Sequence, residues 1–218
     1  MGYHIDSPRQ AGTTRRDALG MAAALLTGGV LSAGAAAPRV DQEEPDDACP
    51  ATYDPEFEAA LAEADAALPE DDARGLPPEG PRPRFRLPLR RHFRVTTRYG
   101  TRGSWSAGHH TGVDLAVPRG TPVYAVGAGV VVLARWSGAY GKAVTVRMSD
   151  GHYAVYGHLS RIQVRQGSHV RAGTRLGSSG STGRATGPHL HLEIRARRQY
   201  GSDINPYRYL ARRGTRLW

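Results

Sequence analysis

Histidines gather at three places in the C-terminal half of this chain, and one aspartate lies close to the first group. The three segments are residues 109–115 (HHTGVDL), 156–160 (YGHLS) and 187–193 (GPHLHLE). Imidazole nitrogens and carboxylate oxygens are ordinary zinc ligands, and histidine readily exchanges a proton near neutral pH. These residue types therefore indicate a metal site, a proton-transfer site, or both.

The third segment predicts a strand, because its polar and apolar residues alternate. Residues two apart on a strand share a face, so we expect His189, His191 and Glu193 on one face and the intervening apolar side chains in the core. Two imidazoles on a rigid surface suit a metal or a proton-transfer pair, although strand histidines by themselves are more often solvated. The spacing does not separate ligand from catalyst within His189 and His191. It also leaves Glu193 open, either as a partner of a histidine or as an exposed carboxylate.

Short apolar runs separated by turn residues surround these segments and must position them. The runs are residues 121–125, 130–133, 143–146 and 153–156. This spacing predicts an all-β domain over residues 89–218, built as an antiparallel sheet with an open substrate groove. The glycine- and serine-rich run at 177–183 lacks the Gly-Lys-Ser/Thr ending of a phosphate loop, so we expect a flexible loop at the groove edge.

A helix and a linker are expected before the β domain, over residues 38–88. Asp54 and Pro55 form a helix start, with Asp54 as N-cap. The apolar stripe comprises Phe57, Leu61, Ala64 and Leu68, and Pro69 ends it. A single helix is not stable alone, so this one either frays or docks on the β domain. Residues 70–88 are rich in proline, glycine and charge, as in a linker.

Residues 1–37 have the pattern of a removable signal peptide. Arg15 and Arg16 precede an uncharged apolar run that ends in two overlapping A-x-A sites, with cleavage after Ala35 or Ala37. The run is just long enough for a membrane anchor, but its weak hydrophobicity and its cleavage sites favour removal. We therefore expect a twin-arginine export signal, a secreted or cell-wall-associated product, and no stable membrane span after processing.

Charge is distributed very unevenly along the chain. Residues 81–218 contain 24 basic and four acidic residues, a net charge of +20, whereas residues 36–80 contain two basic and 14 acidic residues, a net charge of −12. The basic domain predicts an anionic partner such as an anionic cell-wall polymer. Nucleic acid is a weaker alternative, because no nucleic-acid-binding motif is present and export argues against it. A further hypothesis is that the acidic segment covers the basic groove until the linker is cut.

Together, the motifs resemble the LytM/lysostaphin-type zinc metallopeptidases, which cut peptidoglycan. The resemblance covers about residues 93–210 and rests on motifs in the expected order. They are Tyr99-Gly100, His110-x-Gly112-x-Asp114, residues 120–125 (GTPVYA), Gly157-His158-Leu159, Gly180-Ser181-Thr182-Gly183 and residues 189–193 (HLHLE).

The resemblance implies a role for each of five residues. His110, Asp114 and His191 would bind Zn²⁺, and His158 and His189 would be catalytic, while His109 would be a groove residue. The implied activity is that of a zinc metalloendopeptidase hydrolysing peptide cross-links or bridges of bacterial peptidoglycan, with the bond, Gly-Gly or D-amino-acid, left open.

Two further alternatives compete with this activity. The first is a non-catalytic cell-wall-binding or amidase-activating member of the same family, which usually has broken ligand positions. The second is a biotinyl or lipoyl carrier, but Lys142 lacks the flanking residues of an attachment site.

Overall fold

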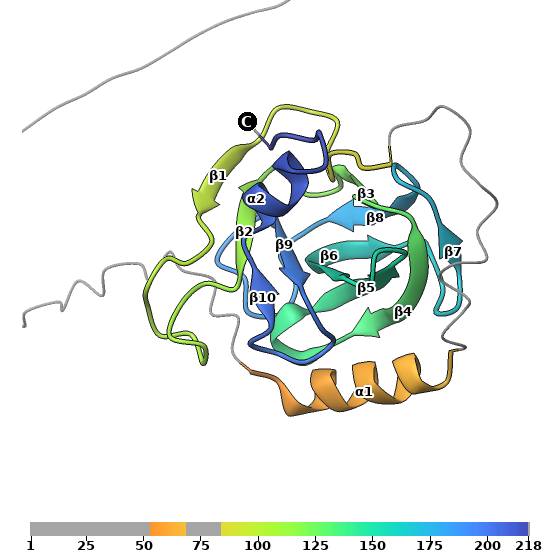
Figure 1. The fold of residues 1–218 in the computed structure, drawn as a ribbon. Helices are drawn as coiled ribbons and strands as arrows, with labels where there is room; N and C mark the ends of the chain where they lie inside the picture. Colours follow the sequence, from red (N-terminus) through yellow and green to blue (C-terminus); the bar gives the residue numbers. More distant parts are fainter. Residues whose placement is uncertain (1–52, 69–83, 218) are drawn as a thin grey trace, which may run out of the picture. The chain divides into compact units, whose positions relative to one another are not determined.

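Ten antiparallel β-strands form one continuous sheet in the computed structural model, which describes residues 53–68 and 84–217. The main path through the sheet runs β1-β2-β9-β6-β5-β4-β7, while β10 pairs with β9 and β8 joins β6 to β3 (Figure 1). The strands are β1 (Arg94–Thr97), β2 (Gly112–Ala116), β3 (Pro122–Tyr124), β4 (Gly129–Trp136), β5 (Lys142–Met148), β6 (Tyr153–Ile162), β7 (His169–Val170), β8 (Arg175–Ser179), β9 (His189–Arg195) and β10 (Asp203–Ile204). The predicted all-β antiparallel fold is confirmed.

The alternation predicted for β9 divides its side chains between two buried environments. Leu190, Leu192 and Ile194 are fully buried in the larger apolar cluster, as expected. The sequence alone allowed the opposite face of β9 to be exposed to solvent, yet every residue of the strand is buried. That opposite face is covered by a short 3-10 turn, η2 (Gly138–Tyr140), and by an N-terminal helix, α1 (Pro55–Ala66). A second short helix, α2 (Pro206–Ala211), follows β10.

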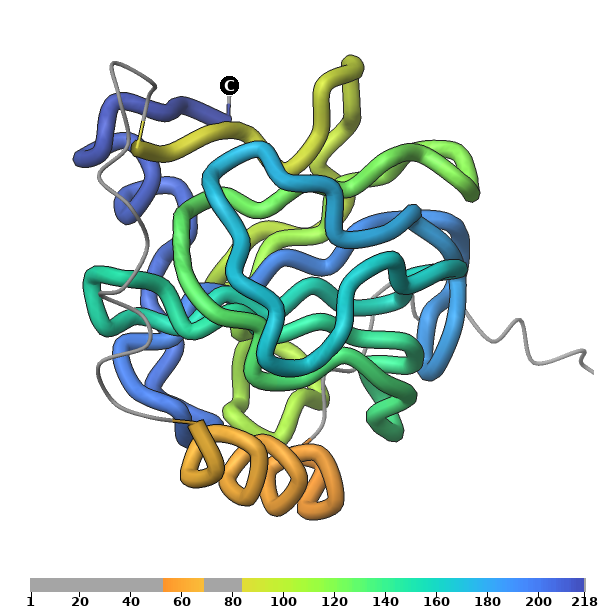
Figure 2. The backbone as a smooth tube through the Cα atoms, turned by 90° about the vertical axis from the view of Figure 1, so that its right-hand side faces the viewer, coloured from red at the N-terminus to blue at the C-terminus, as the bar shows by residue number. Residues whose placement is uncertain are grey.

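Helix α1 begins as predicted and docks on the sheet. The Asp54 side chain accepts hydrogen bonds from the backbone amides of Glu56 and Phe57, both at 3.0 Å. Phe57 and Leu61 are buried in a second apolar cluster together with Val155 of β6. Burying each of these large side chains contributes about 1.5–3 kcal/mol, so packing fixes a helix too short to persist alone. Figure 2 shows α1 lying beneath one side of the sheet.

The glycine- and serine-rich run at 177–183 is only partly the loop that was expected. Residues 177–179 belong to β8, where Ser178 and Ser179 are buried. Glycine is needed at 177 because an added Cβ would lie 2.2 Å from the backbone oxygen of Arg161 on the paired strand. Composition indicated flexibility here, whereas close strand pairing decides the structure.

The expected signal peptide at 1–37 and most of the linker lie outside the described residues, so these domain limits stay predictions. Within the two described ranges, no helix is both long and apolar enough to cross a membrane.

Candidate metal centre and active site

The pairing of β2 with β9 brings the first and third histidine segments together. Asp114 lies opposite His191, and Ala116 lies opposite His189. Directly opposed residues of antiparallel strands share a face, so the Asp114 and His191 side chains meet on the same side of the sheet. His110 precedes β2, and its backbone amide donates to the Thr101 carbonyl at 2.8 Å, which holds His110 beside the other two residues.

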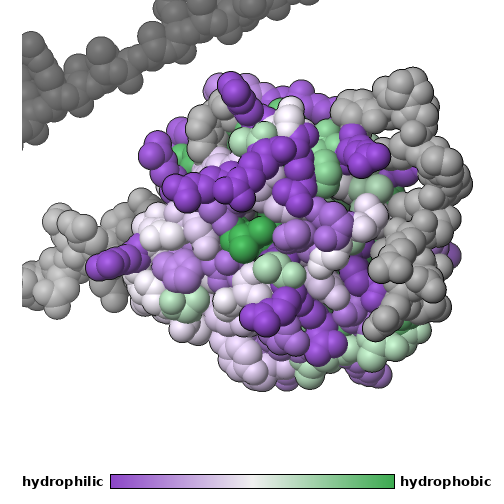
Figure 3. Space-filling view, in the orientation of Figure 1, coloured by the Kyte–Doolittle hydropathy of each residue, from purple (hydrophilic) through white to green (hydrophobic). Residues whose placement is uncertain are grey.

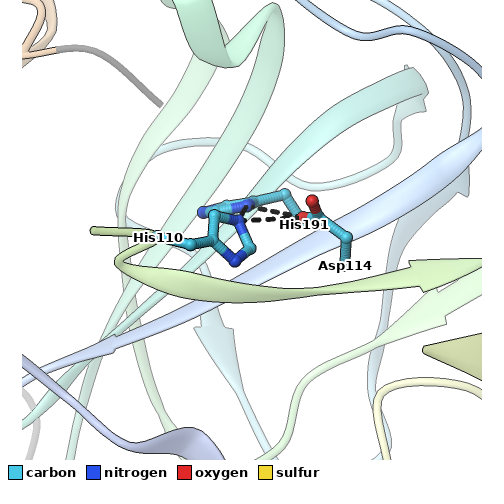
Figure 4. Close-up of side chains that lie close together, drawn as sticks. All are labelled: His110, Asp114 and His191. Carbon is cyan, nitrogen blue, oxygen red and sulfur yellow. Dashed lines mark hydrogen bonds and ion pairs between the residues drawn. The ribbon is translucent and has the colours of Figure 1, made fainter. Parts of the chain in front are cut away.

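His110, Asp114 and His191 present three ligand atoms at similar separations (Figure 4). Asp114 Oδ1 lies 2.9 Å from His191 Nδ1 and 3.3 Å from His110 Nε2, and the two nitrogens are 3.2 Å apart. Ligand atoms held about 2.0–2.2 Å from a tetrahedral metal lie roughly 3.3–3.5 Å from one another. The triangle therefore has nearly the dimensions of one face of a tetrahedral metal site.

The remaining ring nitrogens orient both imidazoles for ligation. His110 Nδ1 lies 3.2 Å from the Arg98 carbonyl, and His191 Nε2 lies 3.5 Å from Glu193 Oε2. These oxygens accept hydrogen bonds, so in the neutral rings the proton lies on these outer nitrogens. The lone pairs of His110 Nε2 and His191 Nδ1 then converge on the Asp114 carboxylate. Three buried electron-pair donors that face one another can hold a cation between them. A ligand set of nitrogen and oxygen atoms without sulfur suits zinc.

Electrostatics also favour an added positive charge at this site. Burial would raise the pKa of Asp114, but His110 and His191 hold that pKa well below its usual range, because in the metal-free site a proton on a ring nitrogen that faces Asp114 hydrogen-bonds to its carboxylate. Burial would likewise lower the pKa of His191, yet contacts with Asp114 and Glu193 raise it to about 9. A proton can supply this charge in the free protein, and metal binding must displace that proton.

His158 and His189 lie beside the triangle. Their ring centroids are 4.7 Å apart, and the His158 ring is 5.9 Å from that of His191. Each Nδ1 donates to a backbone carbonyl, His158 to Thr182 at 2.7 Å and His189 to Gly187 at 2.8 Å. Each Nε2 is therefore the basic nitrogen of its ring. His189 Nε2 is buried without a hydrogen-bond partner and lies 3.7 Å from Asp114 Oδ1.

Burial keeps both of these histidines neutral. It lowers the pKa of His158 to about 3, with further lowering by His191 and His189, and it also lowers the pKa of His189. A neutral imidazole presents a lone pair at Nε2, which is the protonation state that a general base requires before it takes up a proton.

The backbone of His158 is strained. Its φ of 58° is the only positive value for a non-glycine residue among the described residues. This left-handed conformation costs roughly 1–2 kcal/mol for a side chain such as histidine. Strain of this kind persists where the surrounding structure fixes a side chain in place, as at functional sites.

Glu193 resolves the alternative that the sequence left open, because it is a buried partner of His191. Its carboxylate accepts hydrogen bonds from Tyr140 Oη at 2.9 Å and Thr111 Oγ1 at 3.1 Å, and Arg195 Nε also donates to it. Sequence reasoning did not identify Tyr140, Thr111 or Arg195. Thr111 adjoins His110 in the first histidine segment, which is a local signal, whereas nothing near Tyr140 in the sequence indicates its role.

His109, His152 and His169 are not among the three converging residues. His109 is the groove residue that the resemblance implies, and its Nε2 lies 2.9 Å from Asp203 Oδ2. The carboxylate of Asp203 raises the pKa of His109. His152 contacts Asp150 and Tyr209, and His169 is exposed on β7.

Only glycine fits at position 112, because the His191 ring lies very close to its backbone. A Cβ on Gly112 would lie 2.7 Å from His191 Cε1 and Nε2. We expect Gly112→Ala to push the ring out of the triangle and to weaken zinc binding by about 10-fold or more, as displaced outer-shell contacts do. Competition against a chromophoric chelator measures this.

Gly187→Ala is the matched control for Gly112→Ala, because a Cβ there meets nothing within 4 Å. Equal zinc affinities of the two variants would show that the contact of Gly112 with His191 is not needed.

A hollow of about 360 Å³ opens beside the triangle. It is lined by Arg94, Thr96, Asp114, Ala116, Thr186, Gly187, Pro188 and His189. Asp114 and His189 thus border a space that could admit a peptide, in agreement with the groove predicted from the sequence.

Comparison with known proteins identifies the domain. Residues 108–206 match Peptidase family M23. This chain contains an M23 peptidase domain. Its sheet resembles the catalytic domain of the antimicrobial peptidase lysostaphin from Staphylococcus simulans, with 35% identity, a TM-score of 0.52, and coverage of 55% of this chain and 92% of that one. It also resembles a zinc-containing peptidase from Vibrio cholerae, with 31% identity, a TM-score of 0.51, and coverage of 57% and 39%.

Two curated relatives match stretches of similar length in this chain. The DD-carboxypeptidase/endopeptidase Mpg of Neisseria meningitidis is 47% identical over 97 residues, which is 44% of this chain. The peptidoglycan DD-endopeptidase ShyA of Vibrio cholerae is 46% identical over 96 residues, also 44% of this chain. This chain spans about 22% of the length of each of these relatives.

Proposed function

We propose that this protein is a zinc-dependent endopeptidase that hydrolyses peptide cross-links of bacterial peptidoglycan. The observation that carries the proposal is the triangle of His110, Asp114 and His191, with two neutral histidines directly beside it. His110, Asp114 and His191 would hold Zn²⁺, and His158 and His189 would be catalytic. Zinc bound by three protein ligands supplies Lewis-acid chemistry that activates water and polarises a carbonyl group.

The two histidines would move the protons of the reaction. His158 and His189 have basic Nε2 atoms fixed by Nδ1 hydrogen bonds to backbone carbonyls. One can accept a proton from the attacking water, and a protonated imidazole can then hand a proton to the leaving amine. Their burial excludes competing solvent, which strengthens such hydrogen bonds.

A chelation experiment tests this function. The full chain is incubated with dye-labelled peptidoglycan, with and without a chelator, and released dye is measured. We expect release that stops with the chelator and returns when zinc is restored. A folded, zinc-loaded chain that releases nothing would instead support the non-catalytic, wall-binding alternative, against which the five intact site residues argue.

Arg94 supports a D-amino-acid cross-link as the bond that is cut. Arg94 lies opposite Ala116, and Ala116 lies opposite His189, so the three share one face across three strands. Arg94 lines the hollow that His189 also lines. Where a D-amino-acid cross-link carries a free carboxylate beside the bond that is cut, that carboxylate can pair with arginine, whereas the residues of a glycine bridge carry no side-chain carboxylate. The name DD-endopeptidase of ShyA agrees with this choice.

Replacing Arg94 tests the bond preference. We predict that Arg94→Gln lowers kcat/KM by about 10-fold on a cross-linked peptide with a free carboxylate, because one charge-assisted hydrogen bond is lost. The same variant should not change kcat/KM on the amidated peptide. Arg91→Gln is the control, since Arg91 is also exposed and lies three residues earlier, before β1. Equal losses on both peptides would contradict the role of Arg94.

Export and an anionic wall partner are also proposed. The +20 charge of residues 81–218 favours binding to anionic wall polymers. Hydrophilic side chains dominate the face shown in Figure 3, with only small hydrophobic areas between them. Export rests on the pattern of residues 1–37.

A further inference from the structure

Helix α1 reaches the metal triangle through a chain of charged side chains. Glu58 Oε1 accepts from Arg195 Nη1 at 2.8 Å, and Arg195 Nε donates to Glu193. Glu193 in turn contacts His191 Nε2 at 3.5 Å. The side chains of Arg195, Glu193 and His191 are fully buried, and only 13% of the Glu58 side chain is exposed. The last link touches a residue of the triangle.

A second set of contacts holds the same helix against η2. Asp54 Oδ2 accepts from the Ala139 amide at 3.0 Å. Gly138 makes room for this contact, because an added Cβ would lie 1.4 Å from Asp54 Oδ2. The Phe57 ring packs against the Tyr140 ring with centroids 4.7 Å apart. Tyr140 also donates to Glu193, so α1 supports Glu193 through both Arg195 and Tyr140.

Helix α1 does not lie where it would block the hollow beside His189. Its apolar side chains pack against β4, β5 and β6, and no residue of α1 lines the hollow beside His189. The described part of the acidic segment therefore leaves the hollow open. The M23 match begins at residue 108, so α1 reaches the site from outside the matched segment.

We propose that α1 is a supporting part of the active site and that Glu58 and Arg195 are positioning residues for His191. Arg195 is a buried cation between two carboxylates, Glu58 and Glu193. Without Glu58, Arg195 loses one of its two carboxylate partners, and the Arg195 contact that helps Tyr140 and Thr111 to orient Glu193 toward His191 is weakened. Outer-shell carboxylates hold a ligating histidine in its tautomer and orientation, so loss of this support weakens metal binding. The inference rests on the proposed zinc function.

Three variants of the full chain test the inference, with zinc affinity measured by competition against a chromophoric chelator and with kcat and KM measured separately. We expect Glu58→Ala to weaken zinc binding by about 10-fold, at the low end for outer-shell partners. We expect it to lower kcat with little change in KM. Glu58→Gln should restore most of both losses, because its amide oxygen can still accept from Arg195.

Asp65→Ala is the matched control on the same helix. Asp65 accepts from Arg147 Nη1 at 3.1 Å and from Tyr153 Oη at 2.7 Å, away from Glu193. This variant should lower the thermal midpoint about as much as Glu58→Ala, yet leave zinc affinity within about twofold.

Two outcomes would overturn the inference. Equal weakening of zinc binding in Glu58→Ala and Asp65→Ala would mean that α1 only stabilises the fold. Unchanged zinc binding in Glu58→Ala would mean that Glu58 does not position His191. Failure of the proposed function is distinguishable, because the unaltered chain would then release no peptides, whether or not it binds zinc.

Discussion

Replacing His158 with asparagine is expected to lower kcat by about 10²–10⁴-fold, the usual contribution of a positioned acid or base, while zinc stays bound. His158 contributes a neutral Nε2 beside the triangle and is not one of the three converging ligand residues. Asparagine suits this position because it tolerates the left-handed backbone that His158 adopts, with φ of 58°. Single-turnover hydrolysis of a cross-linked peptide, with zinc content determined in parallel, measures the effect.

His189→Ala should show a loss of similar size, and His152→Ala should show none. His152 is matched in residue type but lies away from the site, against Asp150 and Tyr209. Full kcat in the His158→Asn or His189→Ala variant, with zinc bound, would remove that histidine from the mechanism.

Removing the Asp114 carboxylate is expected to weaken zinc binding by more than the roughly 10–100-fold typical of outer-shell changes, and to reduce hydrolysis to background. Asp114 Oδ1 lies within 3.3 Å of His110 Nε2 and His191 Nδ1, so Asp114→Asn removes the negative charge from the proposed ligand set. Isothermal titration of the metal-free variant with zinc measures the affinity.

Asp203→Asn is the control for this change. Asp203 also pairs with a histidine, His109, at 2.9 Å, but it is not one of the three ligand residues. Its zinc affinity should match that of the unaltered chain. Wild-type affinity in Asp114→Asn would mean that the triangle is not the metal site.

Local patterns were enough to predict several of the strands and the start of α1. The alternation in residues 189–193 placed Leu190 and Leu192 in the core, and Asp54 with Pro55 located the helix N-terminus. The meeting of Asp114 with His191 depends on strand pairing across 77 residues, which no local period encodes. The family resemblance, rather than spacing, separated ligand from catalyst in the third segment.

The support behind His191 could not be predicted for a related reason. Glu58 and Arg195 are 137 residues apart in the chain, and they meet only because α1 docks on the sheet. The apolar stripe of α1 predicted that it would need a partner surface but did not identify that surface. Burial of the Glu193 face likewise depends on this docking, so the sequence left open whether Glu193 was exposed.

Mass spectrometry of peptidoglycan digested by the full chain in ¹⁸O-labelled water shows directly whether a peptide bond is hydrolysed. We expect released cross-link peptides with ¹⁸O in one new carboxyl group and a free amine on the partner peptide, and neither product with chelator present. Unlabelled products, cuts only in the glycan strands, or release that persists with chelator would contradict a zinc-dependent endopeptidase.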